Sequence, residues 1–199
     1  MLKMSIGKLL QPNRAPAPHA EEAGQPSRRQ LTAAAIAIAF ASLPDSACAD
    51  VLPEDLHTAA RSILFLKNAP VGRADLGLVF TERAGQELAQ RLGDSLGRQL
   101  RVGSLDLDLR PVALANLAGS TARALFLVDP SQMAARALSG FVQRRGILTI
   151  TSDPSLVNAG LLVMAVRSLP RVTIQVSRVA EQEAGVSFAP AFRMMIQEQ

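Results

Sequence analysis

Short apolar runs that alternate with helix-like segments restrict the folds open to this chain more than any other feature. Three runs, at 76–80, 124–128 and 147–150, carry no charge and are only four or five residues long. Runs of this length and composition are typical of strands that are covered on both faces. Segments with the apolar spacing of helices separate them. The order therefore predicts an α/β fold in three layers, with a mostly parallel sheet flanked by helices.

Amphipathic helices are predicted between these strands from apolar spacing and from capping residues. In one of them, Met133, Ala137 and Phe141 recur every four residues and predict its apolar face. Four helices are predicted. The first begins at Pro53 and ends before Asn68, and the second follows an N-cap at Thr81 and ends at Gly97. The third follows an N-cap at Ser131 and covers 132–143, and the fourth covers 178–184 before Gly185.

Residues 100–109 (LRVGSLDLDL) alternate between apolar and polar side chains, which predicts one further strand. The alternation places Asp106 and Asp108 on one face. Two neighbouring carboxylates can bind a cation or share a proton, but such a pair commonly forms the solvent-facing side of an edge strand. Both interpretations stay open at this point. His57, the one histidine after residue 49, is interpreted as a partly covered surface residue rather than a ligand.

The end of the chain departs from the strand–helix alternation. Strands predicted at 161–166 and 172–176 are joined by only five residues, too few for a parallel crossover, so they should pair as an antiparallel hairpin. Residues 188–196 form a last apolar piece, either a short helix or a strand, in which Pro190 argues against a central strand.

The N-terminal part has the organisation of an export signal. Two adjacent arginines precede an uncharged stretch at 31–43, and a triplet of small residues follows it. The uncharged stretch is shorter than the about 20 residues that span a bilayer. The Ser-Arg-Arg-x-Leu order favours the twin-arginine route, with the general secretory route as the alternative. Cleavage after the triplet predicts one periplasmic domain, 50–199. The residues that carry the signal are Arg28, Arg29, Ala47 and Ala49.

Composition argues against several classes of function. The only cysteine, Cys48, would leave with the signal, and one histidine and one lysine would remain, His57 and Lys67. This removes thiol chemistry, sulfur-bound metal and a serine–histidine pair from the domain. The formal net charge of the chain is +4, but its basic residues are dispersed, and Trp and Tyr are absent. We therefore predict no enzyme, no cofactor, no metal and no nucleic-acid partner.

Residues 146–195 carry an order of motifs that matches a known family. The segments are GILTITSD, then NAGLLVMAV, then RVTIQVSRVAEQEAGVSFAPAFRMM. They resemble the closing half of the YfiR-like periplasmic proteins, which have a G-x-LT-x-SD strand and turn, a two-glycine strand, an RVRFEIN strand and an A-x-x-AGL helix. The earlier part matches in outline only, without the family's tryptophan and cysteines. The matching residues are Gly146, Leu148, Thr149, Ser152, Asp153, Ala159, Gly160, Arg171, Val172, Ile174, Ala180, Ala184 and Gly185.

The resemblance implies a regulatory role in the periplasm. YfiR-like proteins bind the periplasmic part of an inner-membrane diguanylate cyclase and restrain its synthesis of cyclic-di-GMP. Such a role needs an exposed apolar surface and no catalytic group, and it is compatible with a homodimer. The candidate partner-binding residues are Phe65, Leu66, Phe188, Phe192, Met194 and Met195, with closure of the core as their alternative use.

Two other functions stay open. A single-lobe periplasmic module for small solutes would bind its ligand beyond the carboxyl ends of the strands. An enzyme that uses Asp106 and Asp108 is the third hypothesis. The sequence contains neither a GxxxxGK[ST] nor a GxGxxG phosphate loop to support either of them.

Overall fold

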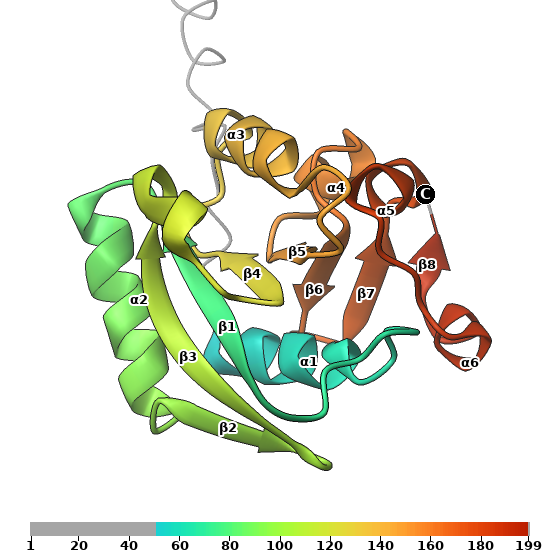
Figure 1. Ribbon diagram of the computed structural model, residues 1–199, viewed down its shortest axis with the longest axis horizontal. Helices are drawn as coiled ribbons and strands as arrows, with labels where there is room; N and C mark the ends of the chain where they lie inside the picture. Colours follow the sequence, from blue (N-terminus) through green and yellow to red (C-terminus); the bar gives the residue numbers. More distant parts are fainter. Residues whose placement is uncertain (1–50, 199) are drawn as a thin grey trace, which may run out of the picture. The chain divides into compact units, whose positions relative to one another are not determined.

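The computed structural model describes residues 51–198 (Figure 1). The predicted signal and its residues Arg28, Arg29, Ala47 and Ala49 lie outside the described residues. In chain order, the described elements are α1 (Pro53–Ile63), β1 (Gly72–Phe80), α2 (Arg83–Ser95), β2 (Gln99–Val102), β3 (Leu105–Ala113), the 3-10 helix η1 (Leu114–Gly119), β4 (Ala124–Leu127), α3 (Gln132–Val142), β5 (Leu148–Thr151), α4 (Pro154–Asn158), β6 (Met164–Arg167), β7 (Thr173–Val176), α5 (Arg178–Ala184), α6 (Pro190–Arg193) and β8 (Gln197–Glu198).

The described strands form one sheet in the order β2-β3-β1-β4-β5-β6-β7-β8. Strands β3, β1, β4, β5 and β6 run parallel as neighbours, whereas β2–β3 and β6–β7 are antiparallel. The connection from β1 to β3 leads toward the β2 edge of the sheet, whereas the connections from β4 to β5 and from β5 to β6 lead toward the β8 edge. Because such crossovers are right-handed, α2 and α3 cover opposite faces. The predicted three-layer α/β fold with a C-terminal antiparallel hairpin is confirmed.

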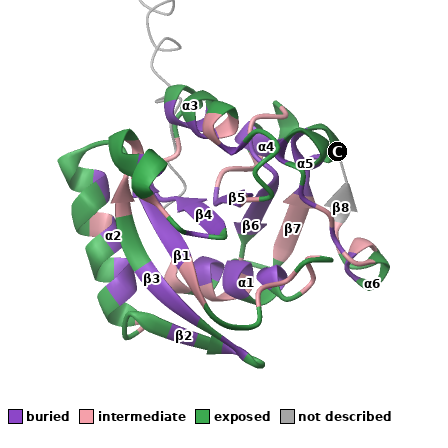
Figure 2. Cartoon of the chain, in the orientation of Figure 1, coloured by how far each residue is buried: buried purple, intermediate pink, exposed green. Residues whose placement is uncertain are grey.

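Burial follows the middle of the sheet and the inner face of α1 (Figure 2). Every residue of β4 and β5 is buried, as expected for strands covered on both faces. On α1 the predicted apolar stripe is buried at Leu56, Ala59, Ala60 and Ile63. The core therefore contains the strands predicted from the uncharged runs and the apolar face predicted for the first helix.

Residues 100–109 form two strands rather than the single strand predicted. Val102 pairs with Leu105 across a two-residue turn, and Gly103 at its first position has φ 57°, which favours glycine. Partners across such a turn face the same side of the sheet. The apolar positions therefore change from even to odd numbers at the turn, a phase change that a single strand would not show.

The apolar face of α3 is not the predicted one. The helix and its cap are as expected, because Ser131 Oγ accepts a hydrogen bond from Ala134 N at 3.2 Å. However, Met133 is 78% exposed, and the helix buries the next stripe along, which also recurs every four residues. Equal spacing left the choice to tertiary packing, and the stripe that begins with the small Ala134 faces inward. The buried residues are Ala134, Ala135, Leu138 and Val142.

Thr81 precedes α2 but does not cap it, since the N-cap position is Glu82. Thr81 N donates to Asp129 Oδ2 at 2.7 Å, and the Thr81 hydroxyl also contacts that oxygen. Asp129 lies two residues after the end of β4, so its carboxylate links the carboxyl ends of two neighbouring strands. This contact brings the first turn of α2 close to the sheet.

Substitution of Gly85 with alanine is expected to lower the free energy of unfolding by about 1–2 kcal/mol, because it overpacks the contact between α2 and the sheet. A Cβ at this position would lie 2.7 Å from Asp129 Oδ2 and 3.0 Å from Phe80 Cβ. Urea unfolding followed by far-UV circular dichroism measures the change.

Gly93 on the same helix is the matched control, because nothing lies within 4 Å of the position of its Cβ. Gly93→Ala is expected to raise the free energy of unfolding by up to about 1 kcal/mol, through helix propensity alone. Equal changes in the two variants would contradict a close contact at Gly85.

Candidate functional site

Two segments far apart in the sequence, 65–67 and 187–189, lie side by side. Leu66 and Phe188 form an antiparallel bridge. Lys67 N donates to Ser187 O at 2.8 Å, and Ala189 N donates to Phe65 O at 2.7 Å. The structure thus brings together the residues predicted to bind a partner. We call this set the C-terminal apolar cluster: Phe65, Leu66, Phe188, Phe192, Met194 and Met195.

The three rings of the cluster pack in a row with Phe192 in the middle, stacked on Phe65 and tilted against Phe188. Its ring centre lies 4.9 Å from that of Phe65 and 4.9 Å from that of Phe188. Phe188 and Phe192 are each 1% exposed, whereas Met194 is 84% and Met195 61% exposed. The two buried rings therefore close the core, as the alternative interpretation held, and the two methionines are the most exposed members of the cluster.

Glu181 of α5 fixes α6, the helix that leads into the methionines. Its Oε1 accepts from Arg193 Nη2 at 2.7 Å and from Phe188 N at 3.2 Å. The Glu181 side chain is 5% exposed and that of Arg193 34%. A carboxylate buried to this degree needs its partners, so the pair ties the end of the chain to the body of the domain.

The second feature is an open hollow of about 1030 Å³. Its floor is the polar face of β1 and β3, and its rim includes the loop 66–71 and residues just before β4 and β5. It lies at the amino-terminal ends of β1, β4 and β5, whereas open α/β sheets usually bind ligands at the carboxyl ends. We call it the arginine hollow after Arg73, Arg110, Arg123 and Arg145, which line it.

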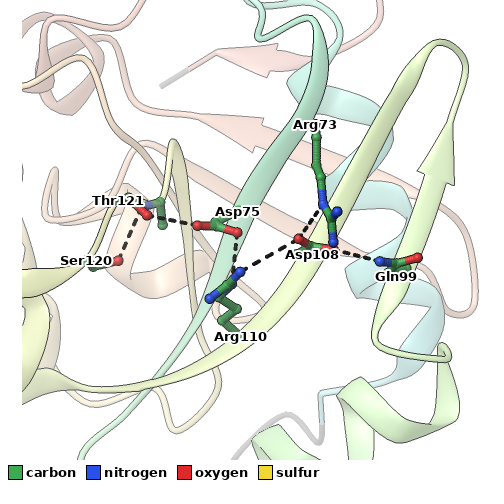
Figure 3. A network of polar contacts seen from close by, with 8 residues as sticks. Arg73, Asp75, Gln99, Asp108, Arg110, Ser120 and Thr121 are labelled. Atoms are coloured by element: carbon green, nitrogen blue, oxygen red, sulfur yellow. Dashed lines mark hydrogen bonds and ion pairs between the residues drawn. The ribbon is translucent and has the colours of Figure 1, made fainter.

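A chain of ion pairs covers the floor of the arginine hollow (Figure 3). Arg73 binds Asp108 with two hydrogen bonds, Nε to Oδ2 at 2.8 Å and Nη2 to Oδ1 at 3.0 Å. Gln99 Nε2 adds a bond to Asp108 Oδ1 at 3.1 Å. Arg110 Nε lies 2.9 Å from Asp75 Oδ1, and its Nη2 lies 3.8 Å from Asp108 Oδ2.

The hydrogen bond from Arg73 holds the pKa of Asp108 below its ordinary value, and desolvation opposes this effect in part. The same hydrogen bond raises the pKa of Arg73. Because the carboxylate of Asp108 is favoured in the folded state, its contribution to stability is present above the pKa of the unfolded chain. The contribution is lost as the pH falls through the lowered pKa.

Asp106 and Asp108 share a face as predicted, but they do not form a joint site. The Asp106 side chain is 57% exposed, and its Oδ1 lies 3.7 Å from Arg101 Nε. Asp108 is paired to Arg73 through two hydrogen bonds, so the two carboxylates contact different arginines. Among residues 51–198, no group of three or more His, Cys, Asp or Glu side chains could hold a metal ion. His57 is half-buried on α1 and lines neither the hollow nor the cluster.

A G-x-S-x-G pattern occurs at 93–97, with Ser95 as its central residue. A nucleophile elbow places this serine on a sharp turn between a strand and a helix. Ser95 instead ends α2, and its hydroxyl donates to Leu92 O at 2.8 Å. The pattern is therefore part of a helix end rather than of a catalytic site.

The arginine hollow was missed by the sequence reasoning. Arg73 and Asp75 precede the uncharged run at 76–80, and the predicted strand began too late to include them. The usable signal was their alternation, because Arg73, Asp75 and Gly77 continue the period of two backward from that run. The partners on β3 could be found only from the register, in which Asp75 faces Asp108.

No family model matches this chain, and no curated protein sequence matches it. The described part, residues 51–198, contains no helix that is long and apolar enough to cross a membrane. What the protein does must therefore be argued from its surface.

Proposed function

We propose that this protein is an exported regulator that binds the periplasmic part of an inner-membrane signalling protein, such as a diguanylate cyclase, and restrains it. The observation that carries the proposal is the C-terminal apolar cluster. Segments more than a hundred residues apart pair there through Leu66 and Phe188. Met194 and Met195 follow the second segment and are 84% and 61% exposed. The predicted export signal and the resemblance of residues 146–195 to YfiR-like proteins support the same role.

The cluster is suited to protein binding because a rigid base carries adaptable side chains. Phe65, Phe188 and Phe192 pack ring against ring, so little order has to be gained when a partner binds. The methionine side chains are flexible and polarisable, and they adapt to an irregular apolar surface. A partner that covers them in only one of its conformations would be held in that conformation, which is how binding alone restrains an enzyme.

Deletion of the gene and measurement of cyclic-di-GMP test the proposal. We expect the level to rise on deletion and to return when the wild-type gene is restored. A gene that encodes Met194→Ser and Met195→Ser should fail to restore it, although the variant protein accumulates normally. An unchanged level on deletion, with no membrane protein that co-purifies with the wild type, would overturn the proposal.

Met133 provides the matched control for the two methionines. It is 78% exposed, but it lies on α3 and outside the cluster. Met133→Ser removes an equally exposed methionine, so it should restore the cyclic-di-GMP level as the wild type does. Failure of both variants would indicate a general effect of lost methionines and would contradict a contact centred on the cluster.

A further inference from the structure

The charges that line the arginine hollow do not balance. Two aspartates face it, and two arginines hold them: Arg73 binds Asp108, and Arg110 binds Asp75 and also lies within ion-pair distance of Asp108. Two further arginines line the same hollow, Arg123 and Arg145. Within residues 51–198, neither of these two side chains forms a hydrogen bond or an ion pair. The hollow therefore carries an excess of two positive charges.

The two unpaired arginines are positioned by different contacts. Arg123 directly precedes β4, where its N–H donates to Asp75 O at 3.2 Å and its carbonyl accepts from Leu148 N at 3.2 Å. Arg145 follows α3, and its guanidinium carbon lies 4.2 Å from the centre of the Phe141 ring. Such a cation–π contact orients the guanidinium. Arg123, directly before β4, and Arg145, in the turn between α3 and β5, both line the hollow.

The remaining lining adds donors to these two charges. A guanidinium has five N–H groups, and Arg73 uses its Nε and Nη2 on Asp108, which leaves Nη1 for a ligand. Asn68, whose side-chain amide can donate hydrogen bonds, also lines the hollow. Carboxylate acceptors on the floor are already bound, with Thr121 Oγ1 donating to Asp75 Oδ2 at 2.8 Å. The free groups are thus mainly donors and cations.

We infer that the arginine hollow binds a small ligand with two or more anionic oxygens, and that Arg123 and Arg145 are its main contacts. Guanidinium groups bind phosphate and carboxylate oxygens through paired charge-assisted hydrogen bonds. The volume of about 1030 Å³ exceeds that of a phosphate ion, so the ligand class includes phosphate monoesters and di- or tricarboxylates. The inference goes beyond the proposed regulatory contact and does not rest on it, since the hollow shares only Leu66 with the cluster.

Calorimetric titration of the mature protein with inorganic phosphate and with citrate, at constant ionic strength, tests the site. At least one of the two anions should bind. Arg123→Gln with Arg145→Gln should weaken that binding by at least about tenfold, the loss expected when charge-assisted hydrogen bonds are removed. Binding of phosphate alone would identify a phosphate-bearing ligand, and binding of citrate alone would identify a polycarboxylate.

Arg136→Gln is the control for loss of one surface charge, because Arg136 is exposed on α3 and does not line the hollow. It should leave the affinity unchanged within about twofold. The substituted side chains are exposed, so all variants should keep the melting temperature of the unliganded wild type. Absence of binding for both anions, or equal affinity in the Arg123/Arg145 variant, would overturn the inference.

Discussion

Replacing Phe192 with alanine is expected to lower the free energy of unfolding by about 3–5 kcal/mol, the usual cost of truncating a buried phenylalanine. Phe192 is 1% exposed, and its ring lies between those of Phe65 and Phe188. Alanine would leave a void between two rings and would remove two aromatic contacts. Because the chain has no Trp or Tyr, the unfolding is followed by far-UV circular dichroism in urea.

Met194→Ala is the matched control, two residues further along the chain. Its side chain is 84% exposed, so the free energy of unfolding should change by less than about 0.5 kcal/mol. A loss below about 1 kcal/mol in Phe192→Ala would show that Phe192 does not close the core. The comparison also separates folding from binding, because only the methionine substitutions can remove a partner contact without loosening the domain.

The strands and helices could be predicted where local pattern and tertiary burial agree. The uncharged runs became β4 and β5, and the short link after β6 produced the expected antiparallel hairpin. The errors arose where two solutions have the same local pattern. On α3 the stripes that begin at Met133 and Ala134 have equal spacing, and only packing against the rest of the domain decides which is buried. In 100–109, the turn at Gly103 was hidden inside an apparent alternation.

The two candidate surfaces differ in how far the sequence could reveal them. The residues of the C-terminal apolar cluster were predicted as a partner-binding surface, because the family resemblance implies one and because they are the apolar residues least needed for the sheet. It could not show that Phe188 is buried while Met194 is exposed, because both are apolar and lie in the same short segment. The arginine hollow depends on register: Asp108 meets Arg73 only because β3 lies beside β1, and no spacing along the chain encodes that neighbour.

Glu181→Ala is expected to lower the free energy of unfolding by about 2–3 kcal/mol. Loss of a partner from a fully buried ion pair costs about 3–5 kcal/mol, but the Arg193 side chain is 34% exposed and can turn to water. The Phe188 N–H, which donates to Glu181 Oε1 at 3.2 Å, would lose its acceptor in a buried position, and this contributes to the loss. Urea unfolding measures the change.

Glu181→Gln separates the two contributions, because glutamine keeps an acceptor for Phe188 N but removes the charge that binds Arg193. Its loss should be about half that of alanine or less, since hydrogen bonds to charged groups are stronger than neutral ones. Equal losses would contradict a role for the Phe188 bond. The alanine variant should also be cut faster by trypsin after Arg193, because α6 would no longer be tied to α5. If Met194 and Met195 bind a partner from a fixed position, Glu181→Gln should weaken partner binding less than Glu181→Ala does.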